Sequence, residues 1–170
     1  DVALLELAAG RAVELHDDWA VTTSVAAAVS RYAQTPDSRL KEVFLSGIGH
    51  LTAKGDMRWA TSHFVSWRKT PILLALQGEG LDTLFAALLP LPRLDYNIEE
   101  LLATIAAQPI DAVIQFLGAR MAHEREGDTG EHYRSVPFTP HVLPACLLPH
   151  PEEMVRAAQT WYAADGVWFQ

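Results

Sequence analysis

The chain has 170 residues, of which 49% are hydrophobic and 20% charged, a balance that is typical of a globular protein and excludes an intrinsically disordered one. Thirteen Lys and Arg against 21 Asp and Glu leave a net charge of −8, which opposes binding to the phosphate backbone of nucleic acid and to anionic lipid. No apolar run reaches the roughly 18 residues that a membrane-spanning helix requires.

Two further features bear on the cell compartment and on the origin of the chain. Cys146 is the only cysteine, so an internal disulfide is excluded and a reducing cytoplasm is expected. The first residues, "DVALLELAAGRAVELHDD", have no basic leader and are not typical of a signal peptide. They start without methionine inside a helical pattern, which predicts an excerpt from a longer polypeptide.

The first predicted helix pair covers about residues 2–33. Two apolar stripes at helical spacing define it, and "HDD" separates them. The stripes are Val2, Leu5, Ala9 and Val13, and then Val21, Val25, Ala28, Val29 and Tyr32.

A second pair is predicted over about 36–69. Thr35 is the expected N-cap and Pro36 the expected first helical residue. Gly55 should end this helix in the left-handed conformation, and Asp56 should cap the next one. The two stripes are Leu40, Val43, Phe44, Ile48 and Leu51, and then Ala60, His63, Phe64 and Trp67.

Three more pairs follow, at about 71–89, 97–126 and 140–165. Thr70 and Pro71 start the third pair. In the fourth, "IEELLATIAAQPIDAVIQFLGARM", Asn97 is the expected N-cap, and Pro109 is expected to begin the second helix of the pair, where its missing N–H is not needed. "PHPEEM" opens the last helix. Strand-like alternation is nearly missing, so β content near zero and one domain, 1–170, are predicted.

The helix-starting prolines at positions 36, 71, 109 and 151 lie 35 to 42 residues apart, which overlaps the length of helical repeat units. This spacing, and the run "LLALQGEGLDTLFAALLPLPRLDYNIEELLATIAAQPIDAVIQFL", resembles α-solenoids of the HEAT or armadillo kind. The chain is also similar to the helical repeat tails of large bacterial multidomain proteins. The resemblance implies an all-α, right-handed solenoid of about five antiparallel helix pairs without a significant β-sheet. Exposed solenoid ends would favour self-association.

A row of aromatic residues is the candidate partner-binding surface. Trp59, His63 and Trp67 recur every four residues and therefore align along one side of a helix. Such a row can grip a peptide or stack on bases. The alternative interpretation is that the row packs against the next helix, with His63 hydrogen-bonded.

No catalytic, metal or cofactor site is predicted. "HEREGDTGEH" places His123 and His132 nine residues apart, whereas two histidines on one face of a zinc-binding helix are four apart. Cys146 has no basic neighbour closer than His141 and His150. The acidic pairs Asp17–Asp18, Glu99–Glu100 and Glu152–Glu153 stand in expected first helical turns, where the helix dipole favours them.

The predicted function is therefore a non-catalytic scaffold or sensor segment that binds a protein, a peptide or other domains of its parent polypeptide. The first alternative is a HEAT-like nucleic-acid-handling enzyme such as a DNA glycosylase, which would need a basic channel that the net charge disfavours. The second alternative is a metal-dependent helical hydrolase that uses His50, His63, Asp95 and His123, although no spacing among these residues supports it.

Overall fold

The computed structural model describes residues 1–60, 70–107, 110–125, 133–136 and 142–164. Of these residues 77% are helical and none lies in a strand, which confirms the all-α prediction. The chain divides into two compact units, Asp1–Leu88 (unit 1) and Leu89–Gln170 (unit 2). That residues 1–170 form one domain stays a prediction.

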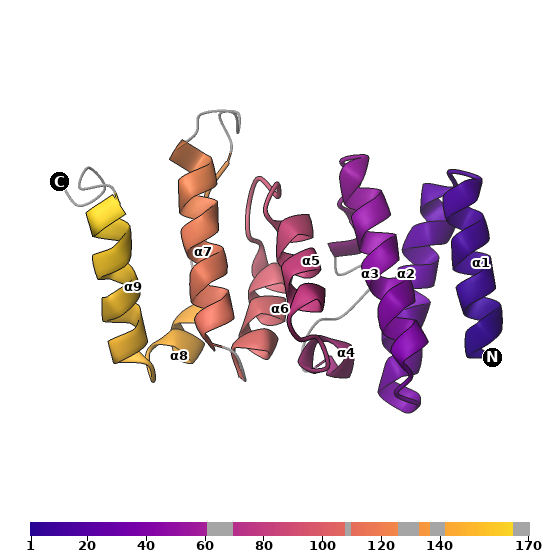
Figure 1. Ribbon diagram of the computed structural model, residues 1–170, viewed down its shortest axis with the longest axis horizontal. Helices are drawn as coiled ribbons and strands as arrows, with labels where there is room; N and C mark the ends of the chain where they lie inside the picture. The colour runs from indigo at the N-terminus through magenta and orange to yellow at the C-terminus, as the bar shows by residue number, and fades with distance from the viewer. Residues whose placement is uncertain (61–69, 108–109, 126–132, 137–141, 165–170) are drawn as a thin grey trace. The chain divides into compact units, whose positions relative to one another are not determined.

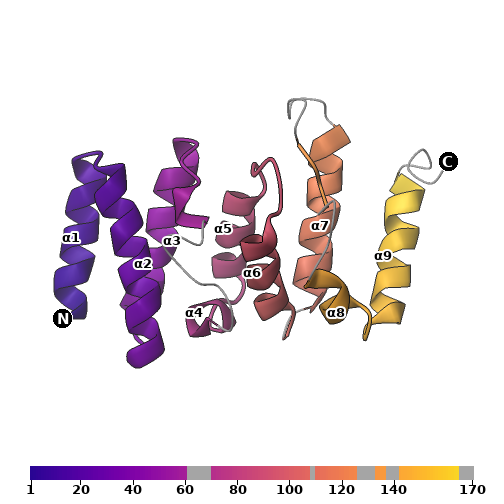
Figure 2. The same ribbon diagram turned by 180° about the vertical axis from the view of Figure 1, so that it is seen from behind.

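Unit 1 is built around three long helices. Figures 1 and 2 show α1, α2 and α3 side by side, and each packs against the other two. α5 packs on α3, and α4 packs on α2. The elements are α1 (Val2–Glu14), α2 (Asp18–Gln34), α3 (Ser38–Ala53), the 3₁₀ helix η1 (Arg58–Ala60), α4 (Pro71–Leu74) and α5 (Glu79–Leu88).

The core of unit 1 follows the predicted apolar stripes. The stripe residues of α2 and α3 are buried because the two helices turn these faces toward each other. The fully buried ones include Val25, Ala28, Leu40, Phe44, Ile48 and Leu51. α1 contributes less to the core, and Ala12 is the one residue of this helix that is buried.

Most predicted helix boundaries in unit 1 are confirmed. Gly55 follows α3 with a φ of 72°, a left-handed conformation that glycine adopts without strain. Asp56 accepts a hydrogen bond from the backbone N–H of Arg58 at the start of η1. Thr70 is the N-cap of α4 and Pro71 stands in its first turn, but this helix has only four residues.

The predicted start of α3 is wrong by two residues. The helix begins at Ser38, and the Asp37 carboxylate accepts a hydrogen bond from the backbone N–H of Arg39 at 3.0 Å. Thr35 instead ends α2 in an extended conformation. Aspartate is the preferred N-cap of the two residue types, so the helix begins after Asp37.

Unit 2 contains α6 (Tyr96–Ala106), α7 (Ile110–Arg125), α8 (Leu143–Leu147) and α9 (Pro151–Ala164). α7 packs against both α6 and α9, and α8 packs on α6. The division of 97–126 into two helices is confirmed, whereas Pro109 lies outside the described residues. Pro151 begins α9 as predicted.

The N-cap of α6 differs from the prediction. Asp95, not Asn97, accepts hydrogen bonds from the backbone N–H groups of Asn97 and Ile98, at 3.0 and 3.1 Å. Glu100 accepts a hydrogen bond from the hydroxyl of Tyr96 at 2.9 Å. Asp95 satisfies two of the N–H groups that a helix start leaves without a partner, which explains why the N-cap of α6 lies two residues earlier than expected.

A close helix approach joins α9 to α7. A Cβ added to Gly118 would lie 2.5 Å from Nε1 of Trp161, so the indole occupies the space that any larger residue at position 118 would need. α9 therefore packs against α7 through the contact of Trp161 with Gly118.

Candidate functional site

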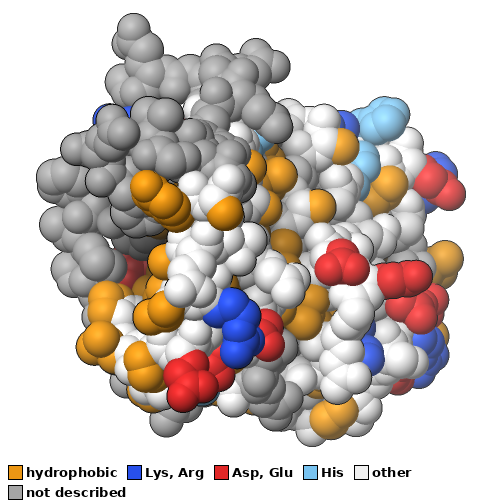
Figure 3. Space-filling view, turned by 60° about the vertical axis from the view of Figure 1, so that its left-hand side comes forward, with side chains coloured by type: hydrophobic (Ala, Val, Ile, Leu, Met, Phe, Trp, Pro, Cys, Tyr) orange, Lys and Arg blue, Asp and Glu red, His pale blue; other side chains and the backbone are white. Residues whose placement is uncertain are grey.

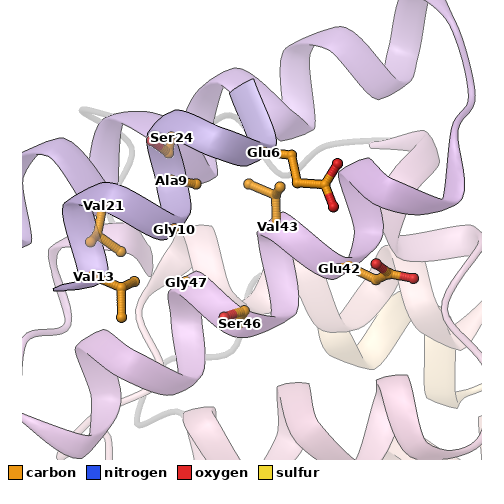
Figure 4. Close-up of a pocket in the computed structure, with 10 residues that line it drawn as sticks. All are labelled: Glu6, Ala9, Gly10, Val13, Val21, Ser24, Glu42, Val43, Ser46 and Gly47. Carbon is orange, nitrogen blue, oxygen red and sulfur yellow. The ribbon is translucent and has the colours of Figure 1, made fainter. Parts of the chain in front are cut away.

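A pocket in unit 1 lies where α1, α2 and α3 meet, and it has a volume of about 260 Å³. Figure 4 shows its lining side chains, which come from one face of each helix. This pocket, called the α1–α3 groove below, is lined by Glu6, Ala9, Gly10 and Val13 of α1, Val21 and Ser24 of α2, and Glu42, Val43, Ser46 and Gly47 of α3.

Small residues create the groove. A Cβ added to Gly47 would lie 2.5 Å from Cγ2 of Val25, so this glycine allows α3 to approach α2 closely. A Cβ added to Gly10 would meet nothing within 4 Å. Gly47 therefore brings the helices together, and Gly10 leaves the space between them open.

The floor of the groove is apolar. Val21 and Val43 are buried beneath it, and Ala9 and Val13 are partly buried beside them. The hydroxyl of Ser24 donates a hydrogen bond to the backbone oxygen of Ala20 at 2.8 Å, so this polar group is already satisfied within its own helix. The floor consequently offers a ligand mainly van der Waals contact and removal of apolar surface from water.

Two carboxylates stand at one end of the groove. Figure 4 shows Glu6 of α1 and Glu42 of α3 at the same end of the groove, beyond Val43, with Val13 and Val21 toward the opposite end. Both glutamates are exposed. Among the described residues neither forms an ion pair or a side-chain hydrogen bond.

Arg39 lies close enough to this acidic end for its charge to interact with both glutamates. Its guanidinium donates from Nε to Oδ1 of Asp37 at 3.1 Å and from Nη2 to Oδ2 at 2.7 Å. These hydrogen bonds raise the pKa of Arg39, and the charges of Glu6 and Glu42 add to the increase. Arg39 is thus held by Asp37 and acts on the two glutamates only through space.

The outer side of α1 is also apolar. Leu4 and Leu7 are 65% and 71% exposed and lie three residues apart, on one side of the helix. Leu15 and Trp19, at the turn into α2, are exposed as well. Since a single exposed leucine is ordinary, the relevant observation is that several exposed apolar side chains lie close together in sequence, on the outer side of α1 and at the start of α2.

The predicted aromatic row is only partly visible. Trp59 lies in η1 and is fully buried, which agrees with the packing interpretation at this position. His63 and Trp67 lie outside the described residues. Binding of a partner by the row as a whole stays a prediction.

Side chains considered for metal or hydrolytic chemistry have local structural partners. The ring of His123 packs edge-on against Tyr133, with 5.2 Å between the ring centroids, and Glu124 accepts a hydrogen bond from the backbone N–H of Ser135. His50 lies 3.3 Å from the carboxylate of Asp18. His132 and Glu126 are outside the described part of the chain, and within that part no group of three or more potential ligands could hold a metal ion.

The sequence interpretation missed two buried charged residues in unit 2. Arg120, fully buried, donates hydrogen bonds to the backbone oxygens of Leu89, Leu91, Arg134 and Ser135. Its guanidinium carbon lies 4.5 Å from the ring centroid of Tyr133, a cation–π geometry. Burial lowers the pKa of Arg120. These contacts hold two non-helical segments against α7.

Glu99 has a comparable role. Its buried carboxylate accepts a hydrogen bond from the backbone N–H of Val142 at 3.0 Å, at the start of α8, rather than simply facing the dipole of its own helix. A signal for both residues was present in the sequence, because Glu99 lies three residues before Leu102, and Arg120 three residues after Leu117. Both therefore fall on the apolar faces of their helices.

The alternative nucleic-acid function would require a basic surface. On the face shown in Figure 3, basic side chains stand next to acidic ones, and the described residues there form no continuous basic patch.

No helix in the described part of the chain combines the length and the apolar character needed to cross a membrane.

Comparisons with protein-family models, with curated proteins and with solved structures found no match for this chain.

Proposed function

We propose that this chain is a non-catalytic segment that binds a protein or peptide partner and is built from stacked helix pairs in the manner of an α-solenoid. The observation that carries the proposal is the α1–α3 groove, which combines an apolar floor with two exposed carboxylates.

The packing order of the helices supports stacking. α3 follows α2 and packs on both preceding helices, and α5 packs on α3 in turn. In unit 2, α8 packs on α6 and α9 packs on α7, so each helix lies against the one two places earlier. This alternation is expected where successive helix pairs cover each other's apolar faces.

The size of the groove favours a partner's side chains over a small-molecule cofactor. Pockets for drug-sized ligands usually measure about 300–1,000 Å³. At about 260 Å³ the α1–α3 groove lies below that range. An apolar cavity of roughly 150 Å³ already takes up a benzene ring. The groove therefore suits one or two anchoring side chains.

The chemistry of the two glutamates also favours binding over catalysis. Paired carboxylates can serve as general acid and base, but the acid of such a pair is usually kept protonated by an apolar environment. Glu6 and Glu42 are instead exposed to water. Exposed carboxylates at the rim of an apolar groove are typical of recognition by charge.

Two glycines provide a matched test of the proposed function. A displayed library of short random peptides would be selected on the wild-type chain and on Gly10→Leu, which fills the groove from a position with open space around it. Gly49→Leu is the control, because Gly49 is also helical, has no atom within 4 Å of an added Cβ, and does not line the groove.

The proposal predicts peptides that bind the wild-type chain and Gly49→Leu equally and bind Gly10→Leu about tenfold or more weakly. Circular dichroism would establish that both variants remain helical. If no selected peptide distinguished Gly10→Leu from Gly49→Leu, the α1–α3 groove would not be the binding site.

A further inference from the structure

The α1–α3 groove is chemically asymmetric, and this asymmetry specifies its ligand. The end marked by Glu6 and Glu42 is acidic, whereas the end marked by Val13 and Val21 is aliphatic (Figure 4). A ligand that is apolar throughout would leave the acidic end unused. A ligand that fills both ends of the groove must therefore carry a cationic group close to an aliphatic group.

The two carboxylates at the acidic end can accept hydrogen bonds from a ligand. Elsewhere in unit 1, Asp18 pairs with Lys54, Asp37 with Arg39, and Asp56 with Arg58. Glu6 and Glu42 form no such pair with any described residue. Because each carboxylate accepts hydrogen bonds through two oxygens, the pair can receive several N–H donors from one cation.

We propose that the α1–α3 groove receives a basic segment of a partner protein, with an Arg or Lys side chain reaching between Glu6 and Glu42 and an aliphatic side chain filling the Val13–Val21 end. Arg and Lys combine an apolar stem with a charged head, so the stem can lie over Val43 while the head reaches the carboxylates. Arginine is the better match, because its planar guanidinium can bridge two carboxylates. This inference rests on the proposed function.

Substitution of Arg39 should change the affinity for a basic peptide in the opposite direction to substitution of Glu6 or Glu42. Its charge acts on both glutamates and would repel a cation that enters between them. Arg39→Gln removes that repulsion and should strengthen binding of a basic peptide. Glu6→Gln and Glu42→Gln keep the size and polarity of each side chain, remove the negative charge, and should weaken binding.

The experiment uses peptides selected on the wild-type chain that fail to bind Gly10→Leu. Their sequences should be enriched in Arg or Lys close to Leu, Ile or Val. Fluorescence anisotropy of one such labelled peptide should show Kd rising about 2- to 5-fold for each glutamate variant and falling by a similar factor for Arg39→Gln, in the range expected for exposed charge pairs. Lys41→Gln, which changes an α3 residue outside the groove lining, is the control for general loss of positive charge.

The outcomes separate this inference from the proposed function. Groove-dependent peptides that lack basic residues and bind Glu6→Gln and Glu42→Gln as tightly as the wild type would overturn the assignment of a basic ligand but retain a docking groove. An equal decrease in Kd for Arg39→Gln and Lys41→Gln would also overturn it, since binding would then respond only to net charge. Failure to obtain any groove-dependent peptide would overturn both.

Discussion

At the scale of single residues, glycines decide where helices approach and where they leave space. Gly47 and Gly49 are two positions apart on α3, yet an added Cβ meets Val25 at 2.5 Å in the first case and nothing within 4 Å in the second. The same substitution should therefore have opposite effects at the two positions.

Gly49→Ala should stabilise unit 1 by about 0.5–1 kcal/mol, because alanine loses less backbone entropy in a helix. Gly47→Ala should have a net cost of about 1 kcal/mol or more, because Val25 is fully buried and cannot move aside freely. Urea unfolding followed by circular dichroism measures both changes. Stabilisation by Gly47→Ala would show that α2 and α3 are less closely packed than described.

Arg120 is the residue on which two non-helical segments of unit 2 depend. Arg120→Leu would leave the carbonyl oxygens of Leu89, Leu91, Arg134 and Ser135 without its donors and should cost about 2–5 kcal/mol. Arg93→Leu is the control, because the same change is made at an exposed side chain of unit 2, where an effect below about 0.5 kcal/mol is expected.

Hydrogen exchange measured by mass spectrometry should show the loss of protection in α7 and in residues 89–94 of the Arg120→Leu variant. Similar unfolding free energies for the two arginine variants would contradict the role assigned to Arg120.

At the scale of helices, the cap residues determine where each element begins. Asp95 accepts hydrogen bonds from two backbone N–H groups at the start of α6, whereas Asn97 is itself one of the donors. Asp95→Ala should lower the free energy of unfolding of unit 2 by about 1 kcal/mol, and Asn97→Ala by less than about half as much. Thermal unfolding of the two variants compares them directly, and a larger loss from Asn97→Ala would restore the sequence-based prediction of the cap.

The helices could be predicted from the sequence to a large extent. Periodic apolar residues indicated α2, α3, α5, α6 and α7, and Pro71 and Pro151 marked helix starts because proline fits the first turn. The prediction of cap residues was less accurate. Several polar residues stand close together before α3 and α6, and small differences in hydrogen bonding decide which of them becomes the N-cap.

The candidate site could not be predicted in the same way. Gly10 and Gly47 are 37 positions apart, and nothing in either segment indicates that their helices pack side by side. The buried Glu99 and Arg120 find their partners in non-helical segments distant in the sequence, beyond the reach of local periodicity. Aromatic spacing instead directed attention to Trp59, which is buried.

At the scale of the whole molecule, the net charge of −8 bears on the class of partner. Non-specific binding to duplex DNA depends on release of counterions by Lys and Arg, with Kd values of about 10⁻⁴–10⁻⁶ M for proteins that have this activity. We expect no binding of a short duplex at low salt by gel shift at protein concentrations up to about 100 µM. Binding that weakened steeply with added salt would instead support the nucleic-acid alternative.

The proposed function depends on the docking of a partner segment in the α1–α3 groove. The most direct measurement is the map of backbone amide chemical-shift changes in the wild-type chain on titration with a peptide selected on it. Docking in the groove should produce the largest changes at Gly10, Val43 and Gly47, and these changes should be lost in Gly10→Leu. Changes concentrated in α9, or at residues outside α1, α2 and α3, would contradict it.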